Sequence, residues 1–200
     1  KDLATPRKDV IMGALQLGAQ GKVDGDMKWR IEAGYYAYSG IRTHQGLTSA
    51  SNTDGNTYEV SGTSRLYSKS YKLIIVGFDF SLPVASKNLT LFNQYVTNTK
   101  TNPSPGYIAG FKWGQLKERG DWNFNYDFRR VPEDSTVGAF TDGDSFGGGT
   151  NGMSHKVSGG YQFAKSWNSS LSYFYGKSGI MPGNVRLNRQ LLQIDLNAKF

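Results

Sequence analysis

The chain ends with the stretch Leu191-Leu-Gln-Ile-Asp-Leu-Asn-Ala-Lys-Phe200, in which apolar residues recur at every second position. Strand side chains alternate between two faces, so one face of this stretch is apolar and the other is mostly polar. The apolar face carries Leu192, Ile194, Leu196, Ala198 and Phe200. At the edge of a soluble sheet these residues would favour aggregation, whereas on a transmembrane β-barrel they would face lipid. The stretch predicts a lipid-facing strand, with the last strand of a soluble β-sandwich as the alternative.

The composition agrees with a wall that separates lipid from water. Aromatic residues make up 14% of the 200 residues, although the mean hydropathy is negative. The most apolar run, residues 73–80, is interrupted by Asp79 and is far shorter than the roughly 18 residues of a membrane-spanning helix. There is no cysteine, which excludes disulfides and thiolate metal sites within the chain. We therefore expect strands, and no helices, to cross the membrane.

The formal net charge of +7 indicates an anionic partner or a cation-lined pore. Basic residues are scattered singly, without a Lys/Arg-rich run or a known nucleic-acid-binding motif. We therefore expect no nucleic-acid partner.

Alternating patterns recur along the whole chain. In residues 27–38, Trp29 and Ile31 alternate with Lys28, Arg30 and Glu32. Comparable patterns predict strands at residues 9–20, 71–82, 107–114, 122–129, 155–163, 171–175 and 191–200. Residues 88–97 predict a further strand, but two competing sets of apolar residues leave its faces unassigned. The chain is therefore predicted to be all-β.

The connections between these strands alternate in length. Short turns fall near residues 22, 84, 118 and 165, and longer segments near residues 50, 101, 142 and 182. Outer-membrane barrels have short periplasmic turns and long extracellular loops. The four tryptophans lie beside the short turns, as an interfacial aromatic girdle requires: Trp29, Trp113, Trp122 and Trp167. The pattern predicts an antiparallel transmembrane β-barrel.

Nine predicted strands is an odd number, whereas single-chain bacterial barrels have an even number. We therefore expect residues 1–200 to be the C-terminal portion, about nine strands, of a single larger outer-membrane barrel domain, with at least one strand before residue 1.

Four segments resemble the putative porin family of bacterial outer-membrane proteins. They are residues 107–114, residues 120–128, the Asp/Gly-rich residues 138–150 and residues 193–200. The resemblance implies a diffusion pore in the outer membrane and assigns no individual functional residues. The last strand also resembles the C-terminal signal of such barrels, which implies the barrel-assembly machinery as a partner.

Charged residues on the polar strand faces are the candidate pore-lining residues. They are Lys28, Arg30, Glu32, Asp79, Lys112, Asp127, Arg129 and Lys156, with Asp195 and Lys199 on the equivalent face of the last strand. The surplus of two positive charges predicts a weak anion preference, and Lys28 and Arg30, about 7 Å apart, form the densest positive site. The alternative is that these residues form structural ion pairs between neighbouring strands.

Other motifs carry little chemistry. Asp142-Gly-Asp-Ser-Phe-Gly147 begins like a calcium loop, but Phe146 and Met153 occupy ligand positions, which favours a flexible or constricting loop. The two histidines have no metal-site spacing, and no serine lies in Gly-x-Ser-x-Gly. We therefore expect no metal site, no cofactor and no enzymatic activity.

These patterns predict a passive, water-filled channel for small hydrophilic solutes or ions. A non-conducting barrel that serves as a scaffold or sheath for a partner protein is the alternative, since both need the same strands. Membrane lipid or detergent is expected around the barrel. The sequence leaves open a homo-oligomer or a partner subunit.

Overall fold

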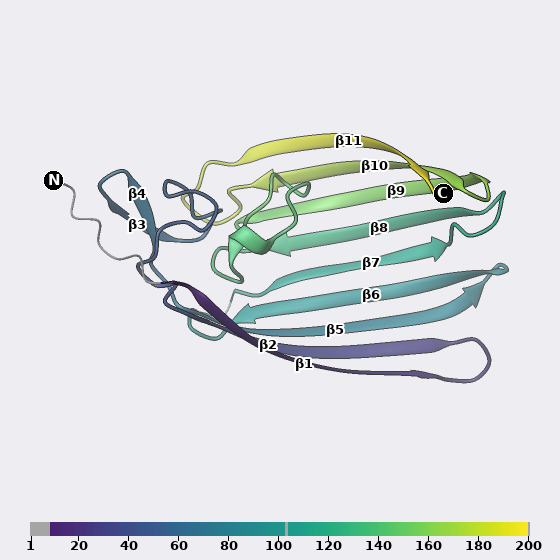
Figure 1. Ribbon diagram of the computed structural model, residues 1–200, viewed down its shortest axis with the longest axis horizontal. Coiled ribbons are helices and arrows are strands. Elements are labelled where there is room, and N and C mark those ends of the chain that lie inside the picture. The colour runs from purple at the N-terminus through teal and green to yellow at the C-terminus, as the bar shows by residue number, and fades with distance from the viewer. Residues whose placement is uncertain (1–8, 103, 200) are drawn as a thin grey trace.

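The computed structural model describes residues 9–102 and 104–199, most of which form one curved antiparallel sheet (Figure 1). Its strands are β1 (Ile11–Lys22), β2 (Lys28–Ser39), β5 (Tyr71–Val84), β6 (Lys87–Asn98), β7 (Gly106–Gly114), β8 (Trp122–Val131), β9 (Gly152–Ala164), β10 (Trp167–Ser178) and β11 (Leu187–Ala198). Each strand pairs with the next in this order. The all-β prediction and its nine antiparallel strands are confirmed. The sheet is not closed, because β1 and β11 are its two edges and do not pair with each other.

The connections divide the sheet into two ends. Residues 23–27, 85–86, 115–121 and 165–166 form the turns at one end. The longer segments 40–70, 132–151 and 179–186 lie at the other end, as does the shorter connection between β6 and β7 (Figure 1). The two-residue turn between β5 and β6 consists of Ala85 and Ser86, with φ values of +49° and +63°. Two successive positive φ values define the type I′ turn, whose twist matches that of the strands it connects.

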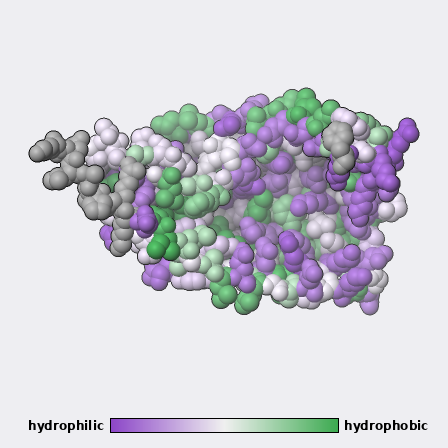
Figure 2. Space-filling view, viewed as in Figure 1, coloured by the Kyte–Doolittle hydropathy of each residue, from purple (hydrophilic) through white to green (hydrophobic). Residues whose placement is uncertain are grey.

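The sheet curves so that one face is concave and the other convex. In the view of Figure 1, segment 132–151 lies in front of the concave face, and Figure 2 shows that this hollow is largely hydrophilic. The apolar positions of the strands point to the convex side, where Ile194 is 76% exposed and Leu17 is 69% exposed. This exposed apolar surface extends across the sheet through Ile31, Val76, Leu91, Phe124, Val157 and Leu171. The convex face is therefore built to contact an apolar medium.

The register assigns the faces of β6, which the sequence pattern left open. Leu89 pairs with Trp113 and Leu91 with Phe111, all on the convex side. Phe92 is out of phase with Leu89 and Leu91, so its side chain points to the concave side.

The main buried apolar cluster lies at the long-loop end and not along the sheet. It contains Ile41, Tyr67, Tyr71, Leu73 and Val137. The long segment expected near residue 50 is not irregular throughout, because it contains the hairpin of β3 (Tyr58–Ser61) and β4 (Ser64–Tyr67). Segment 132–151 includes the short 3-10 helix η1 (Gly138–Phe140). Two loop segments thus pack into one folded unit over the strand ends.

Helices contribute almost nothing to this fold. Within residues 9–102 and 104–199, none is long and apolar enough to cross a membrane.

Candidate pore-lining face

The structure places all eight candidate pore-lining residues on the concave face. The register brings Arg30 opposite Asp79, and Asp127 opposite Lys156. Lys112 lies opposite Thr90 and Asn125, and Asp195 lies opposite Ser170. These residues come from strands that are far apart in sequence. They share one face because side chains alternate between the two faces along each strand.

The contacts of these residues differ from strand to strand. Arg30 Nη2 lies 2.6 Å from Asp79 Oδ2, so these two residues form an ion pair between neighbouring strands. For this pair the structure agrees with the alternative interpretation, in which the charged residues are structural ion pairs. Glu32 instead accepts a hydrogen bond from Gln94 Nε2 at 3.1 Å. Lys28 lies directly opposite Lys22, which makes this end of the face locally positive.

Two of the lysines lie over aromatic rings on the concave face. Lys112 Nζ is 5.1 Å from the centroid of Phe92, and Lys156 Nζ is 4.8 Å from that of Phe174. Such cation–π contacts hold an ammonium group near the wall without neutralising it. Both charges therefore remain effective toward the hollow.

Two further basic residues were missed by the sequence pattern. Lys22 and Arg189 lie on the concave face by register, because β1 extends into an expected turn and β11 begins before the predicted start of the last strand at Leu191. In the described strands this face has seven basic residues: Lys22, Lys28, Arg30, Lys112, Arg129, Lys156 and Arg189. The acidic residues are Glu32, Asp79, Asp127 and Asp195. The positive surplus on the wall is therefore three.

Segment 132–151 crosses the concave face and is attached to it at two points. Asp142 Oδ2 accepts a hydrogen bond from Arg129 Nη1 on β8 at 2.8 Å, and Asp144 Oδ2 accepts one from Gln193 Nε2 on β11 at 3.0 Å. These two carboxylates reduce the positive surplus from three to one. Among the described residues no group of three or more His, Cys, Asp or Glu side chains could hold a metal ion. The Asp142–Gly147 motif therefore acts as an attachment to the wall.

The charge of Asp142 is stabilised by its contacts. Partial burial opposes ionisation, but the backbone N–H of Asp144 at 3.0 Å and the Arg129 guanidinium outweigh it. They hold the pKa of Asp142 below its ordinary value of 3.8. The attachment is consequently an ion pair at neutral pH.

A third attachment joins segment 132–151 to segment 40–70. Asp134 is buried and accepts hydrogen bonds from Tyr71 Oη at 2.5 Å and from both the backbone N–H and the hydroxyl of Thr57, at 3.1 and 2.6 Å. Asn56 Oδ1 also accepts a hydrogen bond from the Gly138 N–H at 2.7 Å. The two loop segments are thereby held as one unit across the mouth of the hollow.

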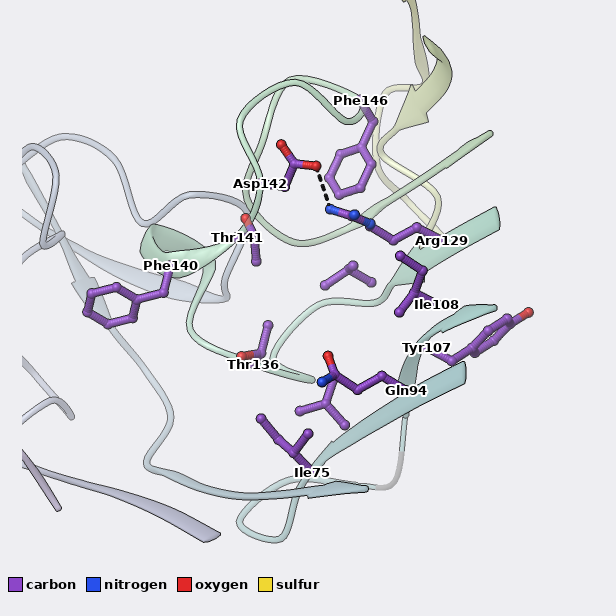
Figure 3. Close-up of a pocket in the computed structure, with 12 residues that line it drawn as sticks. Ile75, Gln94, Tyr107, Ile108, Arg129, Thr136, Phe140, Thr141, Asp142 and Phe146 are labelled. Atoms are coloured by element: carbon purple, nitrogen blue, oxygen red, sulfur yellow. Dashed lines mark hydrogen bonds and ion pairs between the residues drawn. The ribbon is translucent and has the colours of Figure 1, made fainter. Parts of the chain in front are cut away.

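A cavity of about 300 Å³ remains between this unit and the wall (Figure 3). Arg129 and Asp142 lie at one end of it, and Ile75 and Gln94 at the other. The remaining lining residues are Val96, Tyr107, Ile108, Val131, Thr136, Phe140, Thr141 and Phe146. The side chain of Tyr107 points away from this space. The cavity is therefore apolar along its sides and charged at one end.

The proposed assembly signal lies on the convex side of β11. Leu192, Ile194, Leu196 and Ala198 pair with convex residues of β10. Phe200 lies outside the described residues. The structure thus shows the apolar alternation over residues 192–198, and the role of this strand as an assembly signal stays a prediction.

Aromatic residues line the convex side at the short-turn end. Trp113 and Trp122 pack edge to face with ring centroids 5.0 Å apart. Lys87 Nζ lies 5.0 Å from the Trp122 ring and 3.5 Å from Asp121 Oδ1. An aromatic layer next to charged turn residues is typical of the surface of a membrane.

Comparison with known proteins agrees with this arrangement. A family model described as "Putative porin" matches residues 75–200, which run from β5 to the end of the chain. No curated protein and no solved structure matches. The matched region includes the crossing segment and six complete strands of the sheet. Because the match covers more than half of the 200 residues, the chain belongs to the putative porin family.

Proposed function

We propose that the concave face lines a passive, water-filled channel through the outer membrane of a Gram-negative bacterium, for small hydrophilic solutes or ions. The observation that carries this proposal is the division of nine strands into an apolar convex face and a charged concave face. A barrel wall needs this division, because lipid lies outside and water inside. Porins are generally not enzymes, and the proposed channel needs no catalytic step.

The open edges support a barrel as the membrane-inserted form. Among the described residues, β1 and β11 each have one edge of backbone N–H and C=O groups that pairs with no other strand. Each such group would cost several kcal/mol in hydrocarbon, where water cannot satisfy it. We propose that further strands pair with both edges and that membrane lipid covers the convex face.

The crossing segment and the wall charges define the expected conduction. Segment 132–151 narrows the space above the concave face, and the surplus of one positive charge favours anions weakly. Scattered charges in a wide aqueous pore are screened over about 8 Å at physiological salt. The preference should therefore be small and should increase at low salt.

The test is single-channel recording of the full-length protein in planar bilayers. Stepwise ohmic currents with a modest anion preference are expected. A barrel that inserts but stays silent would refute the channel and favour the scaffold or sheath.

We also propose that the barrel-assembly machinery recognises the last strand. Phe200→Ser should then reduce the amount of heat-modifiable barrel in the membrane, with Lys199→Ser as the control on the polar face. Equal amounts of barrel for wild type and Phe200→Ser would contradict this role.

A further inference from the structure

The cavity beneath the crossing segment has the size and lining of a small-molecule site. Its volume of about 300 Å³ lies at the lower end of the range for ligand pockets. Ile75, Val96 and Ile108 from three neighbouring strands form one apolar side. Phe146 from the crossing segment lies beside Arg129 at the charged end, whereas the Phe140 ring points away from the cavity (Figure 3). This space accommodates a flat apolar group of about the size of a single aromatic ring.

The charged end of the cavity is centred on Arg129. Its Nη1 donates a hydrogen bond to Asp142, whereas its buried Nε has no hydrogen-bond partner among the described residues. The guanidinium is therefore not saturated by protein groups. An Arg fork binds a carboxylate through two parallel hydrogen bonds, so a ligand carboxylate could share or replace Asp142.

The charges around Arg129 decide which sign of ligand is preferred. Arg129, Lys156, Asp142 and Lys112 all lie within electrostatic reach of Asp127, which makes a group of five charges around the end of the cavity. Three of them are positive and two are negative. One bound carboxylate would neutralise this group, whereas an amine would add to the surplus.

We propose that this cavity binds small monocarboxylic acids with an apolar or aromatic body. The carboxylate contacts Arg129 in competition with Asp142, and the body lies between Ile108 and Phe146. The inference rests on the proposed channel in naming the solute class that it favours. The cavity would then be a binding site for one class of solute, in a channel whose remaining selectivity comes from charges scattered over its wall.

The test uses the full-length protein in detergent, titrated with benzoate in a calorimeter. Benzylammonium tests the sign of the charge, and acetate tests the apolar body. Benzoate should bind more tightly than either. Arg129→Gln should weaken benzoate binding by about tenfold or more, because a charge-assisted bidentate contact is lost. Arg130→Gln is the matched control, since Arg130 lies on the convex side opposite Tyr107 and Met153.

Two further variants separate the site from a purely structural role of the ion pair. Asp142→Asn removes the competing carboxylate but keeps Arg129, and should tighten benzoate binding. Ile108→Thr should weaken benzoate binding and leave acetate unaffected. If the ion pair only holds the segment in place, Asp142→Asn and Arg129→Gln would weaken binding alike, which would overturn the proposal. Heat-modifiability of each variant reports whether it is folded.

The remaining outcomes are equally decisive. Unchanged benzoate binding by Arg129→Gln, or equal binding of benzylammonium, would overturn the site. Calorimetry in detergent does not require conduction, so the site and the channel fail separately. A silent barrel that binds benzoate would refute only the channel, and a conducting barrel that ignores benzoate would refute only the site.

Discussion

Replacing Asp134 by Ala should loosen the folded loop unit while leaving the sheet intact. Asp134 is only 5% exposed and accepts hydrogen bonds from the hydroxyl of Tyr71 and from two groups of Thr57. The Tyr71 side chain is fully buried, so its hydroxyl could not turn to water after the substitution. The substitution therefore weakens the contacts of segment 132–151 with segment 40–70 and with Tyr71 at the start of β5.

The expected destabilisation follows from these contacts. A buried donor left without an acceptor costs about 1–3 kcal/mol, and each of the two half-buried Thr57 hydrogen bonds contributes about 0.5–1.5 kcal/mol. Local opening should thus become easier by about 2–6 kcal/mol. Even the lower value corresponds to a roughly 30-fold larger opening constant, at about 1.4 kcal/mol per factor of ten.

Limited proteolysis measures this opening directly. Under conditions in which reclosing is faster than cleavage, the rate of tryptic cleavage after Arg65 or Lys69 follows the population of the open form. It should rise by about 30-fold or more in Asp134→Ala, and less in Asp134→Asn, which keeps one acceptor oxygen. Asp24→Ala, in an exposed turn at the other end, is the control. Wild-type protection in Asp134→Ala would show that these hydrogen bonds do not hold the loop unit together.

Three other perturbations test different parts of the structure. Gly152→Ala places a Cβ 2.1 Å from Phe146 Cδ2 and should lower the free energy of unfolding by about 1–3 kcal/mol. The heat-modifiable gel shift should then occur at a lower temperature. Gly159→Ala is the control and should be neutral, because the nearest atom to its new Cβ is 3.6 Å away. Arg30→Glu should move the reversal potential under a salt gradient toward cation preference; an unchanged potential would remove the concave face from control of permeation. Because the pKa of Asp142 is lowered, the stability it contributes is present above pH 3.8 and is lost as pH falls through the lowered value. An acid-active protease should therefore cut segment 132–151 faster only below about pH 3.8, and equal cleavage at every pH would contradict the ion pair.

The sheet was largely predictable from sequence because strand alternation is a local property. The pattern Lys28, Arg30, Glu32 places three charges on one face whatever the neighbouring strands are. Strand ends were less certain, since turn residues such as Lys22 carry no alternation of their own. For β6, Leu91 and Phe92 compete for the apolar face, and only pairing with β7 decides between them.

The arrangement of the loops was not predictable from such patterns. The ion pair between Asp142 and Arg129 joins a Gly-rich segment to a strand face, and the hydrogen bond from Gln193 to Asp144 joins residues 49 positions apart. The alternation of apolar and polar residues along the sequence predicts neither contact. The resemblance of Asp142–Gly147 to a calcium loop reflects the same short carboxylate spacing, which here is satisfied by side chains of the wall.

The four tryptophans all lie near the short turns, so the intrinsic fluorescence of the chain originates from one end of the sheet. In a vesicle with uniformly oriented protein, a water-soluble quencher would dim the emission from one compartment only. Lipids brominated near the headgroup should quench more strongly than lipids brominated at the chain terminus. The emission would then report the orientation and depth of this end in the membrane without any attached label.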